Sequence, residues 1–123
     1  MPFVEKFLGQ VRPSVAANVA DQQNGTVTNA TTLVTCGAGE RIIVRTVFFA
    51  NPTGSRVYYS LWHAADGSTT DHTTVLLPRF GKDKYTTLAL DMYSVLDTAG
   101  SKLLVAVSTA NSMTFSCYGA VFT

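Results

Sequence analysis

The residues best suited to chemistry are two histidines, His63 and His72, with Asp66 and Asp71 between them. Imidazole and carboxylate groups together can bind a divalent metal or act as a general base. Their spacing matches no established metal-ligand motif, and the residues around them are those of a polar loop. We therefore expect a surface loop and no metal site, with a metal-dependent hydrolase as the weaker alternative.

No serine in the sequence has the surroundings of a catalytic nucleophile. There is no Gly-x-Ser-x-Gly turn, and serine and threonine are so frequent that some lie near a histidine by chance. The glycines of residues 36–40 do not lead into a helical segment, so they lack the helix dipole and amides that hold a phosphate. The sequence predicts a non-enzymatic protein with no catalytic residues and no cofactor.

The two cysteines, Cys36 and Cys117, both lie in apolar segments rich in β-forming residues. Zinc sites need ligands from closely spaced pairs, and these two cysteines are far apart in the chain. The first residues lack the pattern of a secretory signal, so we expect synthesis in a cytosol and reduced, buried thiols. A disulfide or a metal-binding role is the alternative.

Trp62, with Tyr58 and His63 nearby, offers an aromatic platform for a sugar or another flat ligand. Because side chains alternate along a strand, about half of these residues must face a core, and packing is the favoured interpretation. A short basic cluster, Arg79, Lys82 and Lys84, reads as a solvated turn. A salt bridge from this cluster to an acidic partner surface is the functional alternative.

The composition points to self-association. Nine Lys and Arg against eight Asp and Glu give a net charge of +1, which disfavours nucleic acid as a partner. Charged residues make up only 14% of the sequence and hydrophobic ones 46%, so part of the apolar surface is expected to contact other chains. Residues 103–123 carry no charge, but their serines, threonines and asparagine argue against a membrane span.

The strongest predicted strand covers residues 41–51 and is apolar on both faces. Such a strand is expected to be covered on both sides, either centrally within the fold or by a subunit contact on its outer face. We expect the subunit interface to include Ile43, Val47 and Phe49, with Ile42, Val44, Phe48 and Ala50 on the opposite face.

Turn signals recur every eight to twelve residues after residue 30, and no sustained helical period appears. This pattern predicts an all-β protein: a single β-sandwich or jelly roll of about seven to eight antiparallel strands over residues 31–123. Residues 1–30 are poor in apolar side chains and are expected to form an extended N-terminal arm that anchors in a neighbour. A frayed terminus or a strand laid on the chain's own domain is the alternative.

The sequence TTLVTCGAGERIIV at residues 31–44, followed by Asn51 and Thr53-Gly54, resembles small β-sandwich virion proteins of tailed bacteriophages. In that group a short strand ending in Thr-x-Pro-Ala-Gly leads into a long strand ending in Asn-x-(Thr/Ser)-Gly, and a Leu-x-Leu strand follows, here at residues 88–90. Gly37 departs from the motif, which has proline at that place.

The resemblance implies a structural protein located in the virion and no catalytic residues. The first expectation is a head decoration (cement) protein, a homotrimer that stabilises the capsid by binding across subunits of the major capsid protein. Its arm would then contact the capsid through Phe3, Val4, Phe7, Leu8 and Arg12. The alternative is a tail, neck or fibre component that acts as a receptor- or carbohydrate-binding module.

Overall fold

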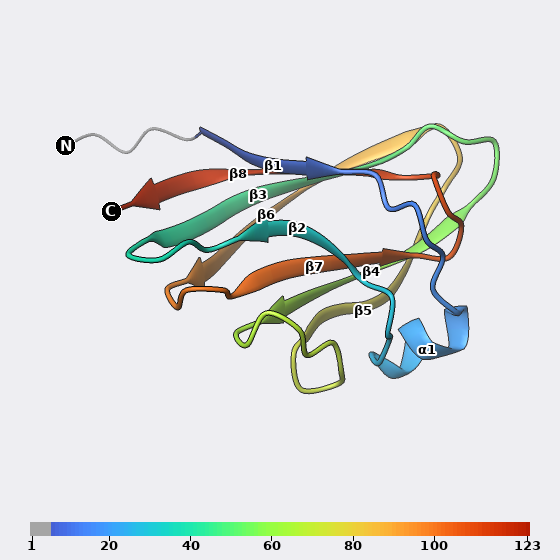
Figure 1. The fold of residues 1–123 in the computed structure, drawn as a ribbon. Helices are drawn as coiled ribbons and strands as arrows, with labels where there is room; N and C mark the ends of the chain where they lie inside the picture. The colour runs from blue at the N-terminus through green and yellow to red at the C-terminus, as the bar shows by residue number, and fades with distance from the viewer. Residues whose placement is uncertain (1–5) are drawn as a thin grey trace.

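The protein is a two-layer β-sandwich in a computed structural model that describes residues 6–123 (Figure 1). One sheet has the strand order β1-β8-β3-β6 and the other β2-β7-β4-β5, and all the strand pairs are antiparallel. The strands are β1 (Lys6–Val11), β2 (Thr31–Thr35), β3 (Arg41–Asn51), β4 (Val57–Ala64), β5 (Val75–Lys82), β6 (Thr86–Leu96), β7 (Lys102–Val107) and β8 (Thr114–Phe122).

The strand order is that of a jelly roll. Most consecutive strands lie in opposite sheets, and β1 pairs with β8 from the far end of the chain. This interleaving of two four-stranded sheets is the double Greek key of jelly-roll proteins. The expected all-β sandwich is therefore confirmed, with eight strands among the described residues.

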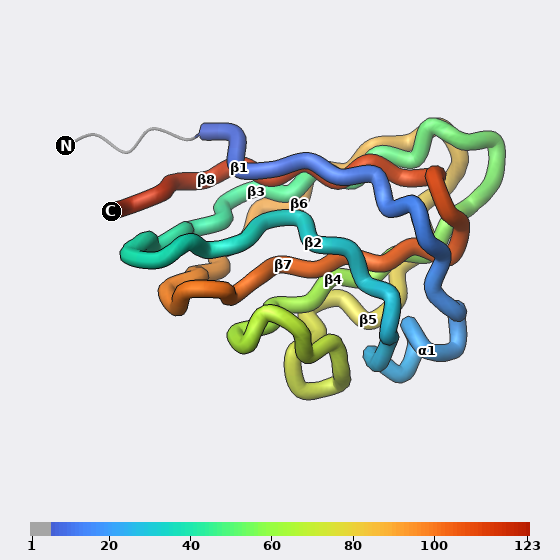
Figure 2. Tube along the Cα trace, viewed as in Figure 1, coloured from blue at the N-terminus to red at the C-terminus, as the bar shows by residue number. Residues whose placement is uncertain are grey.

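A short segment between β1 and β2 covers the outer face of the β2-β7-β4-β5 sheet. It contains helix α1 (Val19–Asn24), which begins where the Asn18 side chain accepts a hydrogen bond from the Ala20 amide (2.8 Å) and ends at Gly25 in the left-handed conformation. Figure 2 shows the chain leaving β1 and passing across to α1 beside the other sheet. A second apolar cluster forms beneath this segment from Ala17, Val27, Trp62, Ala64, Leu104 and Ala106.

The described part of the expected arm belongs to the sandwich. Residues 6–11 pair with β8, Leu8 packs against the main core, and the Arg12 guanidinium donates a hydrogen bond to the Asn111 carbonyl. Residues 6–11 thus form a strand of the sandwich itself, which is the alternative to a separate arm that ends at residue 30. Backbone pairing with β8 supplies the stabilisation that the few apolar side chains of this segment could not. Phe3 and Val4 lie outside the described residues.

Glycine at position 9 lets β1 approach β2 and close one side of the sandwich. A Cβ atom at Gly9 would overlap the Leu33 carbonyl oxygen of β2, so no other residue fits without a shift of the backbone.

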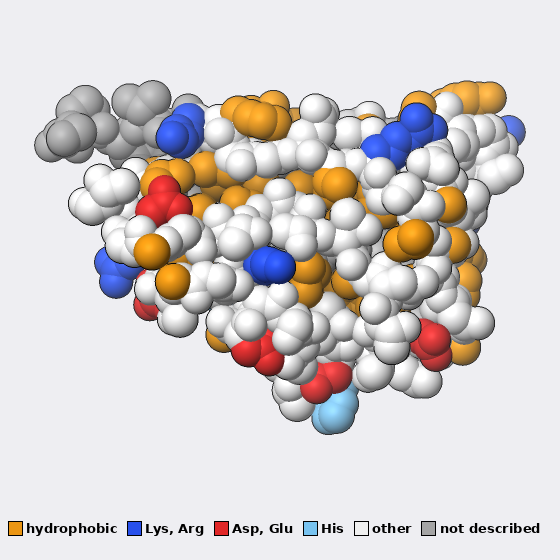
Figure 3. Space-filling view, viewed as in Figure 1, with side chains coloured by type: hydrophobic (Ala, Val, Ile, Leu, Met, Phe, Trp, Pro, Cys, Tyr) orange, Lys and Arg blue, Asp and Glu red, His pale blue; other side chains and the backbone are white. Residues whose placement is uncertain are grey.

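Figure 3 shows this side of the molecule, where acidic and basic side chains are few and lie apart.

A β-bulge in the middle of β3 corrects the expected assignment of its faces. Between Val44 and Thr46 the register shifts against both neighbouring strands: against β8, Arg45 is an extra residue of β3, whereas against β6 the extra residue lies in β6. The alternation therefore reverses, and Val47 and Phe49 turn into the core, where both are fully buried. They are core residues of one chain and not a subunit interface. Of the three residues expected there, Ile43 alone stays on the outer face.

The reversal is testable by substituting one residue from each face. Val47→Ala should lower the free energy of unfolding by about 2 kcal/mol, because it removes two fully buried methyl groups and leaves a cavity. Ile43→Ala, on the partly exposed face, should cost no more than about 1 kcal/mol. Urea denaturation followed by the fluorescence of the single tryptophan measures both. Equal losses would contradict the assigned faces.

Candidate functional site

The outer face of the β1-β8-β3-β6 sheet carries both apolar and polar side chains, and no segment among residues 6–123 covers it. Its centre is a row of three aromatic rings from β1, β8 and β3. Tyr118 lies between Phe7 and Phe48, in edge-to-face contacts with centroid distances of 5.7 and 5.5 Å. Phe7 is 52% exposed and Phe48 37% exposed. We call Phe7, Phe48 and Tyr118 the aromatic face.

Polar groups lie on the same sheet surface around the aromatic face. Arg45 lies over the Tyr93 ring, 5.9 Å from its centroid, and the Thr46 hydroxyl is 3.4 Å from an Asp91 carboxylate oxygen. An apolar centre with a polar rim is the usual anatomy of a protein–protein interface. The aromatic face and its surroundings share this arrangement.

A pocket of about 380 Å³ opens on the side of the sandwich opposite to β1 and β2, between the edge strands β5 and β6. Two polar groups meet in it: His63 Nδ1 lies 3.4 Å from the Ser94 hydroxyl. The other lining residues are Leu61, Leu76, Leu77, Leu90, Met92, Tyr93 and Val95. Among residues 6–123 no carboxylate lines the pocket to orient the imidazole, so the described lining lacks the third member of a nucleophile–base–acid set.

The structure does not assemble the expected aromatic platform. Trp62 is fully buried beneath the α1 segment, and its indole N–H donates to the Gly25 carbonyl (2.9 Å). His63 lies one residue further along β4 and points to the opposite face of the sheet, into the pocket. Tyr58 shares the face of Trp62 but sits near the other end of β4. Trp62 is therefore a core residue and cannot stack on a ligand.

The aspartates of the polar loop serve the turns that contain them. Asp66 accepts hydrogen bonds from the Ser68 and Thr69 amides (2.9 and 2.8 Å) and from the Thr69 hydroxyl. These bonds, the Thr69 hydroxyl first, lower the pKa of Asp66 to about 2. Asp71 is held in the same way by Thr73, whose hydroxyl and amide lower the pKa of Asp71.

His63 and His72 do not form a metal site with these aspartates. Within residues 6–123 no group of three or more His, Cys, Asp and Glu residues is placed to hold a metal ion. His72 remains an exposed loop residue.

Both cysteines are buried free thiols. The Cys36 thiol lies 3.3 Å from the Leu96 carbonyl oxygen, and Cys117 faces the main core next to Val47. Burial raises the pKa of the Cys117 thiol to about 12, because its thiolate would lose its hydration.

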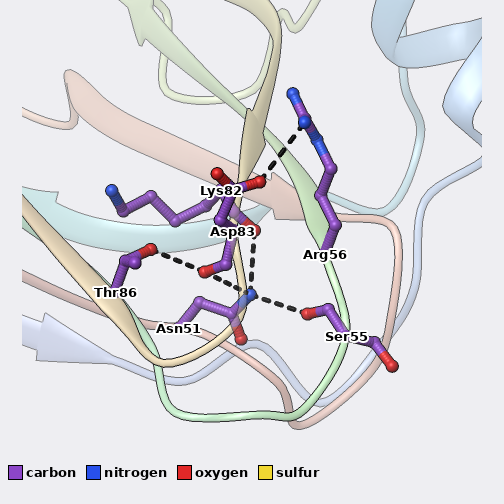
Figure 4. Close-up of polar contacts among 6 residues, drawn as sticks. All are labelled: Asn51, Ser55, Arg56, Lys82, Asp83 and Thr86. Atoms are coloured by element: carbon purple, nitrogen blue, oxygen red, sulfur yellow. Dashed lines mark hydrogen bonds and ion pairs between the residues drawn. The ribbon is translucent and has the colours of Figure 1, made fainter.

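The basic turn of the sequence is well ordered around Asn51 (Figure 4). The Asn51 side-chain amide donates to the carbonyls of Ser55 (2.9 Å), Lys82 (2.9 Å) and Asp83 (3.3 Å), joining the β3–β4 and β5–β6 turns. Asp83 also forms a salt bridge with Arg56 (3.3 Å). The sequence showed Lys82 and Asp83 in this cluster but not Arg56, because strand pairing alone brings Arg56 beside them.

No helix among residues 6–123 is long and apolar enough to cross a membrane.

No protein-family model and no curated protein matches the sequence. Solved structures match nearly all of it at low identity. A chain of the infectious bursal disease virus particle is 15% identical, with 98% of this chain and 30% of that chain covered and a TM-score of 0.47. Drosophila NLP-core is 9% identical over 98% of both chains, with a TM-score of 0.42. Tobacco streak virus coat protein is 7% identical over 97% of this chain and 85% of that chain, with a TM-score of 0.44.

These matches share the jelly-roll fold with the present chain and carry no argument about its function. The chain spans less than a third of the infectious bursal disease virus chain that it matches. The fold class itself follows from the strand order described above.

The loop aspartates predict an acid-sensitive turn. A carboxylate whose pKa is lower in the folded state than in the unfolded state stabilises the fold above its unfolded pKa, and this contribution is lost as the pH falls through the folded pKa. NMR titration should give Asp66 a pKa of about 2. Asp66→Asn should make stability depend less on pH below about pH 4. An ordinary pKa for Asp66 would contradict the turn geometry.

The thiols should be unreactive in the folded protein. At pH 8 a thiol-specific reagent such as Ellman's reagent should label neither cysteine on the timescale of minutes, and both after unfolding in urea. Rapid labelling before unfolding would show that one thiol is exposed, and absence of labelling after unfolding would show a disulfide.

Proposed function

We propose that this chain is a non-enzymatic structural protein of a tailed-bacteriophage virion, a head decoration protein that acts as a homotrimer and binds across capsid subunits. The resemblance of residues 31–54 to such proteins and the low content of charged residues support this role. The observation that carries the proposal is the exposed aromatic face on the β1-β8-β3-β6 sheet.

The aromatic face provides the attachment in this proposal. An aromatic side chain can bury about 150–250 Å² against a neighbour, and rings already in mutual contact lose little side-chain entropy on binding. A trimer would present three such faces to the capsid. Simultaneous binding through several weak contacts gives a strong attachment overall, provided that the geometry allows all of them.

The structure changes the way in which residues 1–30 would contribute to binding the capsid. Leu8 packs in the core and Arg12 bonds to Asn111, so these two residues are engaged within their own chain. Among the described residues expected to contact the capsid, Phe7 is the hydrophobic one that stays exposed, and it lies in the aromatic face. Contact with the capsid is therefore assigned to a sheet surface and not to a clamp of thirty residues.

The alternative of a tail, neck or fibre module with a carbohydrate site loses its main residue. Trp62 was the ring best suited to stack on a sugar, and it is fully buried. No other observation favours that alternative.

The proposal predicts that a charge in the aromatic face prevents attachment. Phe48→Asp should leave the fold intact, because Phe48 points outward, and should reduce the amount of protein that co-sediments with purified capsid shells by about tenfold or more. Val15→Asp is the matched control, since Val15 is 46% exposed in the segment that covers the other sheet. Light scattering of the free protein gives its oligomeric state.

Two results would contradict this proposal. In the first, wild-type protein does not bind shells at any concentration tested. In the second, Phe48→Asp and Val15→Asp bind equally well, so that the aromatic face has no part in attachment.

A further inference from the structure

Two arginines lie over one tyrosine ring on the outer face of the β2-β7-β4-β5 sheet. The Arg79 guanidinium carbon is 4.9 Å from the centroid of the Tyr58 ring, and that of Arg56 is 5.6 Å away. Both distances are within the range of cation–π contacts. Both arginines are exposed, whereas Tyr58 is half-buried. We call Arg56, Tyr58 and Arg79 the arginine site.

Local features of β5 build this arrangement. Between the pairs Tyr59–Phe80 and Leu61–Leu77 the strand β5 has one residue more than β4, and this bulge contains Pro78 and Arg79. The bulge turns Arg79 to the outer face, where Tyr58 lies. Gly81 pairs with Tyr58 and leaves room for Arg56, because a Cβ atom at Gly81 would overlap the Arg56 guanidinium.

The charge of the arginine site is incompletely balanced. Arg56 forms the salt bridge to Asp83, whereas no carboxylate among residues 6–123 pairs with Arg79. Four cations belong to this region, namely Arg56, Arg79, Lys82 and Lys84, against Asp83 alone. The rest of the sequence has five Lys and Arg against seven Asp and Glu, so the positive charge is concentrated here.

We propose that the arginine site binds carboxylate groups on an acidic segment of a partner protein. A guanidinium stacked on a ring keeps its N–H edges free, and these edges match a carboxylate in two parallel hydrogen bonds. The net charge of +1 gives no long-range attraction to nucleic acid, so an acidic protein surface is the better partner. The inference rests on the proposed function in one respect, that the partner belongs to the capsid shell.

A labelled octaglutamate peptide is the probe, with octaglutamine as the uncharged control. Wild-type protein should bind octaglutamate at low salt and lose it as salt is raised, and octaglutamine should not bind. Arg79→Gln should weaken binding about fivefold. Arg41→Gln, the same change at an exposed arginine on the other sheet, should leave binding unchanged.

A second variant gives an effect that damage to the fold cannot produce. Asp83→Asn removes the carboxylate that competes for Arg56, so it should strengthen octaglutamate binding about twofold. Equal weakening by Arg79→Gln and Arg41→Gln would overturn the arginine site. Tighter binding of a DNA duplex than of octaglutamate at equal salt would overturn its assignment to acidic proteins.

Capsid shells separate this inference from the proposed function. If wild-type protein ignores shells while octaglutamate binds with the expected dependence on Arg79, the proposed function fails and the arginine site stands as a carboxylate site. If wild-type and Arg79→Gln proteins coat shells equally at all salt concentrations, the proposed function stands and the arginine site has no part in it.

Discussion

The bulge at Arg45 in the central strand β3 determines which side chains of this strand face the core and which face outward. Strand β3 lies between β8 and β6. Ile42 and Val44 face the core before the bulge at Arg45, and Val47 and Phe49 face it afterwards. Without the extra residue the rings of Phe48 and Phe49 would exchange places. The bulge therefore places Phe49 in the core and Phe48 beside Tyr118 in the aromatic face.

The chain covers the outside of one sheet and leaves the other exposed. Residues 13–29 cover the β2-β7-β4-β5 sheet and bury Trp62, which would otherwise be a large apolar ring in water. The β1-β8-β3-β6 sheet has no such cover among the described residues, and the outer face of β3 there presents Ile43, Phe48 and Ala50 beside Arg41 and Thr46. Under the proposed function, the exposed rings of this face form the contact with the capsid.

The sequence was sufficient to predict the all-β sandwich and the bounds of β3, because two-residue periodicity and turn residues are local signals. It was insufficient for the bulges, among them those at Arg45 and at residues 78–79, because a bulge depends on how a strand pairs with its neighbours. Strand β5 continues through Pro78, since proline is tolerated at a bulge on an edge strand. Strand β1 was predicted only as the alternative to an extended arm, because Gly9 and Gln10 break its apolar pattern.

In the proposed role, the aromatic face and the arginine site lie on the outer surfaces of opposite sheets, so that one copy can contact two neighbours at once. They also differ in physical character. Burial of aromatic surface is strong but has little directionality, whereas paired guanidinium and carboxylate groups are directional and weaken with salt. An apolar contact would then supply most of the affinity, and the charged contact would fix orientation and reject partners that lack an acidic segment. A subunit that must repeat in one orientation on a large surface needs both properties.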